Sequence, residues 1–489
     1  MFKLILIELK KIFHKKSIFV MMIIILIFSL LNNILFYTDY DNDGNYKYLE
    51  KEDFKEEKEK LKNELKKYNF NNESDVSMYV SLKTKLDVID IKEKFISNTW
   101  QYKKIEDYLY IALENVNVYT YQIKDETLLN DAKEKLEEYL NKLNENDWKY
   151  FINKDIEEKN SEINVLEKQL ELVIEEKEKL KIKELVNVRK EELRILNYRL
   201  ENNIKYDDSY LNNSLNMLLE SGNRIKYYED KKNLSYKEKY EYQLEKESFY
   251  TNKYILDNKQ NYNKQNNLSY QLRTIVDDYE IFVIIIILII ASTIVAEEFR
   301  DGTIKLLLIK PYSRGKILLS KYFAVIITLL IVILYLILLQ LIIGGFIFGF
   351  SSLKIPVIVY NFSIDCVLEY DIFIYMLIRI LTKLPMLIML VSISFCLSTV
   401  INNVSTSITI PLFIYIFTSS INYFIVEYKI NIFKYFINVN WEFNNYLFGK
   451  ISEMDGLGFR ISLIIWCIYF IIIMVFTYFN FKKKNIRNL

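Results

Sequence analysis

Long apolar runs alternate with charged stretches along this chain of 489 residues, and six of the runs have the length and composition of membrane-spanning helices. A helix needs about 20 apolar residues to cross a bilayer. The runs are residues 17–37, 280–296, 322–350, 373–400, 405–426 and 461–481. The second run rises only about 24 Å as a helix, so we expect Tyr279 and Phe282 to anchor it at the interface. The pattern predicts an all-α membrane protein with six transmembrane helices.

Residues 1–16 precede the first run and carry apolar side chains at helical spacing. These side chains are Phe2, Ile5, Leu6, Leu9, Ile12 and Phe13. Lys10, Lys11 and His14 interrupt them, a pattern typical of a helix that lies in the membrane interface. We therefore predict an amphipathic elbow helix, with a frayed basic tail as the alternative. The first run lacks a small-residue cleavage site, so we expect an uncleaved anchor.

The charged stretch 38–279 separates the first two runs and has the pattern of helices. No glycine lies between Gly44 and Gly222 to interrupt them. Apolar residues follow three-four spacing before Lys181 and again after Val186, with Glu and Lys on the other faces. If continuous, a helix from Ser161 to Ile204 would be about 65 Å long. Both ends of the stretch enter the membrane, so we predict an antiparallel, coiled-coil-like helical stalk domain.

Cations orient the predicted spans. They precede the first run, fill the connector between the second and third runs, and follow the last run. The groups are Lys10, Lys11, Lys15 and Lys16; Arg300, Lys305, Lys310, Arg314, Lys316 and Lys321; and Lys482, Lys483, Lys484 and Arg487. By the positive-inside rule all three groups are cytoplasmic, which an even number of spans permits. Frequent Lys, Asn, Ile and Tyr are typical of an AT-rich bacterial genome. We predict a multi-pass protein of the bacterial plasma membrane, with both termini cytoplasmic and residues 38–279 extracytoplasmic.

The connector 297–321 carries two helix-start signals. Gly302 can close the preceding helix in a left-handed cap, and Thr303 can cap a short helix that carries three leucines. Pro311 disfavours helix at the residue before it, and Ser313 can cap the helix of the third run. The sequence predicts a stubby helix held at the membrane face by two rigid spans. An ordinary, well-capped loop is the alternative.

The order of residues in this connector resembles the coupling region of type-2 ATP-binding-cassette (ABC) exporter permeases. The resemblance covers the membrane part, about half of the chain, and is strongest from Glu297 to Lys321. A weaker similarity lies at Phe395–Asn403, where a span ends in small and polar residues. The residues that match the coupling pattern are Glu297, Glu298, Gly302, Thr303, Leu306, Leu307, Pro311, Ser313, Arg314 and Lys321.

The resemblance implies a mechanism and partners. The short helix would sit in a cleft of a separate ABC ATPase subunit, which binds ATP and Mg, and would transmit its closure to the spans. Glu297 and Arg314 could pair with each other or contact the ATPase. A second permease copy or a paralogue would complete a dimeric pore. The implied function is export across the plasma membrane of a substrate such as a peptide, a lipid or an antimicrobial compound.

The large insert departs from this family, many members of which have only a short first outer loop. The competing hypothesis is a membrane-anchored extracellular binding or sensor protein whose stalk is the functional part. Tyrosine and asparagine are frequent from Tyr206 to Tyr270, and such surfaces suit binding of peptides or glycans. Packing between helices is the alternative explanation for these tyrosines.

Few residues offer catalytic chemistry. His14 is the only histidine, so a histidine-cluster metal site or a Ser-His-Asp triad cannot form within one chain. Gly315-Lys316 lacks the upstream glycine of a phosphate-binding loop. We expect no enzymatic activity, metal or cofactor in this chain, and membrane lipids but no nucleic acid among its partners. The three cysteines suggest no disulfide framework.

Two cations lie within the fourth run. Arg379 and Lys383 are four residues apart and share a helix face, so they could form an intramembrane polar site. The alternative, which we favour from the sequence, is that both extend to the outer interface. The stretch 427–460 is too apolar for a plain loop, and Trp441, Phe443 and Tyr446 suggest burial at the membrane interface. The resemblance to the permease family implies short re-entrant helices there.

Overall fold

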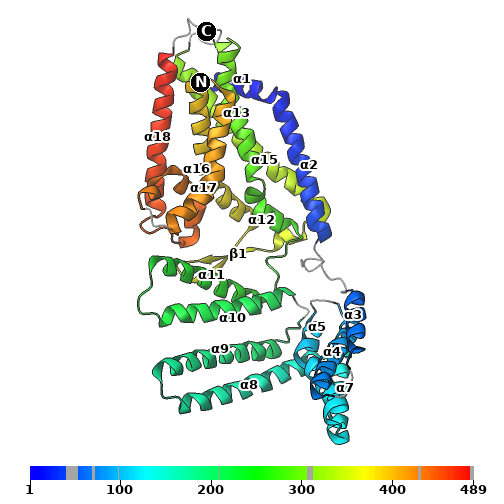
Figure 1. The fold of residues 1–489 in the computed structure, drawn as a ribbon. Coiled ribbons are helices and arrows are strands. Elements are labelled where there is room, and N and C mark those ends of the chain that lie inside the picture. Colours follow the sequence, from blue (N-terminus) through cyan, green and yellow to red (C-terminus); the bar gives the residue numbers. More distant parts are fainter. Residues whose placement is uncertain are drawn as a thin grey trace. The chain divides into compact units, whose positions relative to one another are not determined.

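The computed structural model describes residues 1–39, 53–68, 72–96, 99–206, 209–304, 312–427 and 431–484. The chain forms two compact units. One consists of Met1–Asn45, Ile225–Tyr254 and Gln260–Leu489, and we call it the membrane unit. The other consists of Tyr46–Arg224 and Ile255–Lys259, and we call it the insert unit. Helices dominate both, as the sequence predicts (Figure 1).

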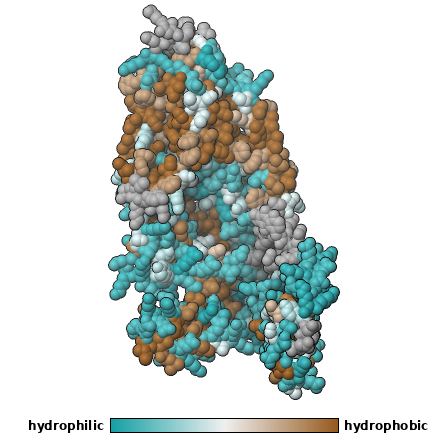
Figure 2. Space-filling view, in the orientation of Figure 1, coloured by the Kyte–Doolittle hydropathy of each residue, from teal (hydrophilic) through white to brown (hydrophobic). Residues whose placement is uncertain are grey.

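Five helices of the membrane unit are long and apolar enough to cross a bilayer. They are α2 (Lys16–Asp39), α13 (Glu280–Arg300), α15 (Arg314–Phe348), α16 (Ile372–Ile401) and α18 (Phe459–Lys483). Each coincides with a predicted span, and the apolar surface gathers over them (Figure 2). The predicted span 405–426 falls on α17 (Val404–Glu427), of which the described stretch Val404–Thr418 is one of the shorter apolar helices. A sixth crossing therefore stays a prediction.

α13 lies at the centre of the membrane unit, packed against α15, α16 and α17. Small residues let α16 approach closely, as in many membrane helix pairs. The Ser398 hydroxyl donates to the carbonyl of Ser292, 2.6 Å away, and accepts from the amide of Ala296 at 3.1 Å. By contrast, α2 and α18 keep most of their apolar surface exposed. α13 is therefore the core helix, and α2 and α18 are peripheral.

Shorter helices complete the membrane unit. They are α1 (Phe2–Phe13), the unit's portion of α10 (Ser209–Asp230) and of α11 (Tyr236–Asn258), and α12 (Leu268–Asp278). The expected short helices before the last span are the 3-10 helices η4 (Asn431–Tyr435), η5 (Ile437–Val439) and η6 (Phe443–Gly449); a further one, η3, spans Ser351–Lys354. Of the three aromatic residues predicted to be buried here, Trp441 and Phe443 are buried and Tyr446 is half-buried.

The all-α prediction is wrong at one place. Strands β1 (Val357–Asn361) and β2 (Cys366–Tyr370) pair antiparallel, with Val357 opposite Tyr370 and Asn361 opposite Cys366. Both strands are rich in β-branched and aromatic residues, which favour a pleated pair over an irregular loop. The hairpin occupies the connection between α15 and α16, which the sequence pattern left without structure.

The insert unit is helical, as predicted. Its elements are α3 (Lys55–Leu65), α4 (Glu73–Lys92), α5 (Trp100–Lys104), η1 (Ile105–Leu109), α6 (Tyr110–Asn117), η2 (Val118–Ile123), α7 (Glu126–Asn144), α8 (Trp148–Leu172), α9 (Glu176–Glu201) and the first part of α10. The single helix considered for Ser161–Ile204 does not form, because the backbone becomes extended at Val173. α8 and α9 instead make a hairpin, joined by an ion pair of 2.7 Å between Glu162 and Arg189.

Two glycines with left-handed backbone give a matched test of this fold. Gly449 has φ +84°, and a Cβ there would lie 2.1 Å from the Ser363 hydroxyl oxygen, whereas Gly302 has φ +70° and no atom of the described residues within 4 Å of such a Cβ. Left-handed backbone costs a non-glycine residue about 1–2 kcal/mol. We expect Gly302→Ala to lower the thermal unfolding midpoint in detergent by this backbone cost alone. Gly449→Ala should lower the midpoint further, because its Cβ would also collide with Ser363. Equal shifts would contradict the close approach at Gly449.

Candidate functional site

A buried lysine joins three helices at the end of the membrane unit where the predicted connector begins and ends. Lys321, in the second turn of α15, is fully buried. Its ammonium lies 3.0 Å from a carboxylate oxygen of Glu8 on α1 and 2.7 Å from one of Glu298 on α13. It also donates to the carbonyl of Ile294 at 3.1 Å. These partners compensate a charge that would otherwise be very costly to bury.

Lys11 completes an ion cluster of four alternating charges, formed by Glu8, Lys11, Glu298 and Lys321. The Lys11 ammonium lies 3.1 Å from Glu8 and 2.9 Å from Glu298, on the carboxylate oxygens that Lys321 leaves free. Burial lowers the pKa of Lys11, but hydrogen bonds and charges from Glu298 and Glu8 outweigh it and raise that pKa above its ordinary value. Lys11 therefore carries its charge throughout the neutral range.

A second ion pair lies beside this cluster, formed by residues four positions after Lys11 and one position before Glu298. Lys15 follows α1 and places its ammonium 2.6 Å from Glu297 and 3.0 Å from the Thr293 hydroxyl. Glu297 and Glu298 are adjacent, so neighbouring carboxylates at the end of α13 bind two successive lysines of the N-terminal segment. The elbow helix is thus tied to α13 by side chains as well as to α15.

The buried face of α1 differs from the predicted apolar stripe. Leu4, Glu8 and Ile12 are the buried residues, spaced four apart, whereas Phe2 and Leu6 are 71% and 48% exposed. A count of apolar residues missed Glu8, because its carboxylate compensates a lysine more than three hundred residues away. The detectable signal was its position between Leu4 and Ile12 on one helix face. The predicted helix itself is present.

Arg314 does not pair with Glu297. Its guanidinium donates to the carbonyl of Lys482 at 2.8 Å, in the last turn of α18, and to that of Lys484 at 3.1 Å, just after the helix. An arginine is well suited to these carbonyls because its fork of donors can reach two at once. Glu297 takes Lys15 as its partner instead. The start of α15 is therefore fastened to the end of α18.

The other predicted coupling residues can be placed in part. Gly302 is left-handed directly after α13, and Ser313 caps α15 by accepting from the amide of Lys316 at 3.4 Å, so both backbone predictions are confirmed. The Thr303 hydroxyl contacts the carbonyl of Glu298 at 3.5 Å. The remaining three, Leu306, Leu307 and Pro311, lie outside the described residues, as does most of the predicted short helix.

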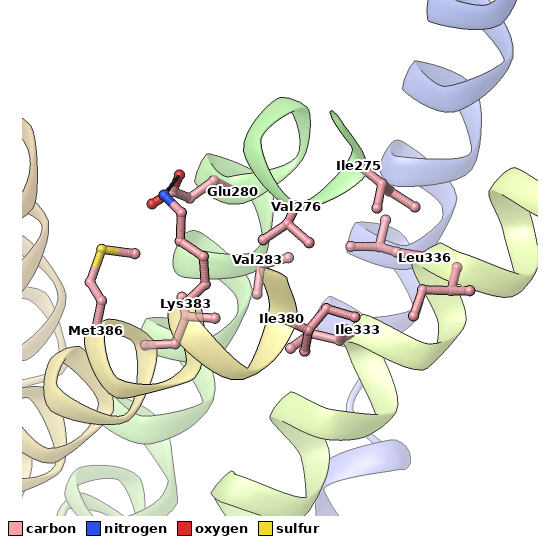
Figure 3. A pocket seen from close by; sticks show the side chains of 11 residues that line it. Ile275, Val276, Glu280, Val283, Ile333, Leu336, Ile380, Lys383 and Met386 are labelled. Carbon is pink, nitrogen blue, oxygen red and sulfur yellow. Dashed lines mark hydrogen bonds and ion pairs between the residues drawn. The ribbon is translucent and has the colours of Figure 1, made fainter. Parts of the chain in front are cut away.

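Arg379 and Lys383 are paired with carboxylates and do not extend freely to the interface. The Lys383 ammonium lies 2.9 Å from Glu280 and 3.5 Å from Asp277, and the residue is buried (Figure 3). Arg379 forms an ion pair with Asp277 and donates to Asn444. These acids stand at the end of α12 and the start of α13, so the two cations fasten α16 to that junction.

A polar cluster between α2 and α15 was missed. Gln340 and Asn33, both buried, exchange hydrogen bonds of 2.7 and 3.1 Å, and the Ser29 hydroxyl donates to Gln340 at 3.3 Å. The signal in the sequence was the presence of amide side chains inside apolar runs, because such side chains in membrane helices usually form hydrogen bonds to a neighbouring helix. The cluster sets the register of α2 against α15.

The tyrosines of α11 have structural partners. Tyr254 donates to Glu369 at 2.9 Å, and the rings of Tyr250 and Tyr360 stack with centroids 5.5 Å apart. These contacts join α11 to the β-hairpin within the membrane unit. The packing explanation of these side chains is therefore favoured over a free aromatic binding surface.

The ion cluster can be tested by removing its centre. Lys321→Met leaves Glu8 and Glu298 facing each other in a buried site, and breaking a buried pair costs about 3–5 kcal/mol. We expect a lower thermal unfolding midpoint in detergent. Lys316→Met, on the exposed face of the same helix, is the control and should change little. A midpoint equal to that of the control would show that the cluster does not hold these helices together.

Comparison with known proteins identifies a family whose function is not established. A family model described as "Protein of unknown function (DUF2705)" matches residues 241–487, just over half of the chain. The uncharacterized protein YhcI of Bacillus subtilis (strain 168) is 30% identical over 201 residues, which are 41% of this chain and 64% of that protein. The matched part thus spans less than two thirds of this relative. No solved structure matches. From the match over its membrane-unit sequence, the chain belongs to the DUF2705 family.

Proposed function

We propose that this chain is the permease subunit of an ATP-driven exporter, and that residues 297–321 couple it to a separate ATPase subunit. The observation that carries the proposal is the anchoring of both flanks of this connector. Glu297 and Glu298 bind the lysines of the N-terminal segment, and Arg314 holds the end of α18. A force applied to the connector would therefore reach four helices together.

In this proposal, movement would pass from the connector into the two helices that it joins. α13 ends at the connector and α15 begins from it. α13 is also the core helix, packed against α15, α16 and α17, so a tilt at its end is passed to its neighbours. The ion cluster obliges α1 to follow, because sliding α1 away would expose or unpair buried charges.

In this mechanism ATP, bound with Mg by the partner, closes a pair of ATPase subunits. The connector moves with them, and the spans change between inward and outward access. Two permease copies, or this chain and a paralogue, would enclose the pathway. The exported substrate would be a molecule such as a peptide, a lipid or an antimicrobial compound, and the extracytoplasmic insert is the part that departs from other exporters of this type.

The coupling assignment is tested at Leu307. Leu307→Asp would place a charge in an apolar docking cleft and should abolish recovery of an ATPase with the purified, membrane-inserted protein. Leu307→Met conserves the apolar character and is the control, expected to retain the ATPase and ATP hydrolysis. The measurement is gentle detergent purification from the native membrane, with identification of co-purifying proteins and an ATPase assay.

Two results would contradict the proposal. One is normal ATPase association and hydrolysis with Leu307→Asp. The other is a well-folded wild-type protein that brings no ATPase in any preparation, which would favour the alternative of an extracellular binding or sensor protein.

A further inference from the structure

A cavity of about 290 Å³ lies beside the ion cluster, between α1, the start of α2 and the last turns of α13. Its polar wall comprises Glu8, Lys11, Lys15, Glu297, Glu298 and Asp301. Lys15 and Glu297 are each 31% exposed, so the polar wall is accessible from outside. A volume of this size is at the lower end for small-molecule sites. It suits a head group with the first part of its chains better than a whole lipid.

The opposite wall is apolar and continues onto α2. Ile12, Ile18, Ile289 and Ile290 line it. From Ile18 the apolar surface runs along exposed side chains of α2, including Phe19 at 67%. α2 contacts α13 only slightly compared with α15, which leaves this side of the cavity bounded by one exposed apolar helix. A ligand that extends from the cavity along α2 must therefore be amphiphilic.

The charges of the polar wall select the head group. Four carboxylates, those of Glu8, Glu297, Glu298 and Asp301, meet four cations, those of Lys11, Lys15, Lys321 and Arg300, which lies 3.0 Å from Asp301. These balanced charges favour a zwitterionic ligand over an anionic one, because its own ammonium, whose three donors match carboxylate oxygens, offsets its phosphate. Lys15 and the Ser17 hydroxyl, both in the lining, can donate to a phosphate.

We propose that this cavity binds a phospholipid whose head group carries both a phosphate and a primary ammonium, with the ammonium at Glu297 and Asp301 and the phosphate at Lys15. Its acyl chains would follow the isoleucine wall onto α2. The lipid would fill the angle between the elbow helix and α13. This inference does not depend on the proposed export function, because the cavity, its charges and the exposed face of α2 carry it alone.

The test is native mass spectrometry of the full-length protein in detergent, titrated with phosphatidylethanolamine, phosphatidylglycerol or soluble phosphoethanolamine. We expect phosphatidylethanolamine to be retained at lower concentration than the other two. Asp301→Asn, at the exposed rim, should weaken its binding about tenfold through loss of a charge-assisted hydrogen bond. Ile289→Phe should weaken it by filling the apolar wall. Ile281→Phe, an exposed isoleucine near the other end of α13, should bind like the wild type.

Each of the following outcomes would contradict one part of the lipid proposal. Equal retention of phosphatidylglycerol would refute the ammonium selection. Binding of free phosphoethanolamine as tight as that of the lipid would identify a site for a water-soluble ligand. Unchanged binding in both Asp301→Asn and Ile289→Phe would show that the retained lipid lies elsewhere on the apolar surface. The ATPase plays no part in these measurements, so their failure would leave the coupling assignment standing.

Discussion

The need to compensate one buried cation shapes the end of the membrane unit. Lys321 has no exposed surface, and its ammonium reaches carboxylates from α1 and α13. A lone ammonium in such a place would be strongly destabilising, so α15 can occupy this position only with both partners present. The placement of the elbow helix follows from that constraint. Glu8 must be brought beside α15, and the amphipathic face of α1 is set by that requirement.

Buried ion clusters seldom add stability over apolar packing of the same volume, so their distinct contribution is specificity of arrangement. An apolar contact between α1 and α15 could slide by a turn with little change in buried area. The alternation of Glu8, Lys11, Glu298 and Lys321 has one register in which all four charges are paired. The pair of Lys15 with Glu297, which adjoins Glu298 in the sequence, is a further contact that favours this register.

The sequence was a good guide where a property is local. Apolar run length located the spans, glycine predicted the left-handed residue at Gly302, and serine chemistry predicted the cap at Ser313. It was a poor guide where a side chain's role depends on a distant partner. Glu8 had no part in the predicted apolar stripe, and its role depends on Lys321. Lys383 looked free to reach the interface until Glu280, on another helix, was found beside it.

The remaining misses share a physical origin. The hairpin of β1 and β2 and the break between α8 and α9 both depend on which segments meet, and intrinsic propensity is a weak predictor of such pairing. Apolar spacing alone could not distinguish one long helix from two that fold back, because both bury the same stripe. The turn at Val173 brings Arg189 beside Glu162, and this long-range pairing is what favours the hairpin.

The two ends of the core helix α13 are stabilised in the same way. At its start, Glu280 and the preceding Asp277 bind Lys383 and Arg379 of α16; at its end, Glu297 and Glu298 bind lysines of the N-terminal segment and α15. Between these ends its contacts are apolar side chains and serine hydroxyls, which permit small tilts without unpaired charge. A movement at either end of α13 would therefore carry along the helices to which its ion pairs are joined. Such a linkage is what the coupling proposed for the connector requires.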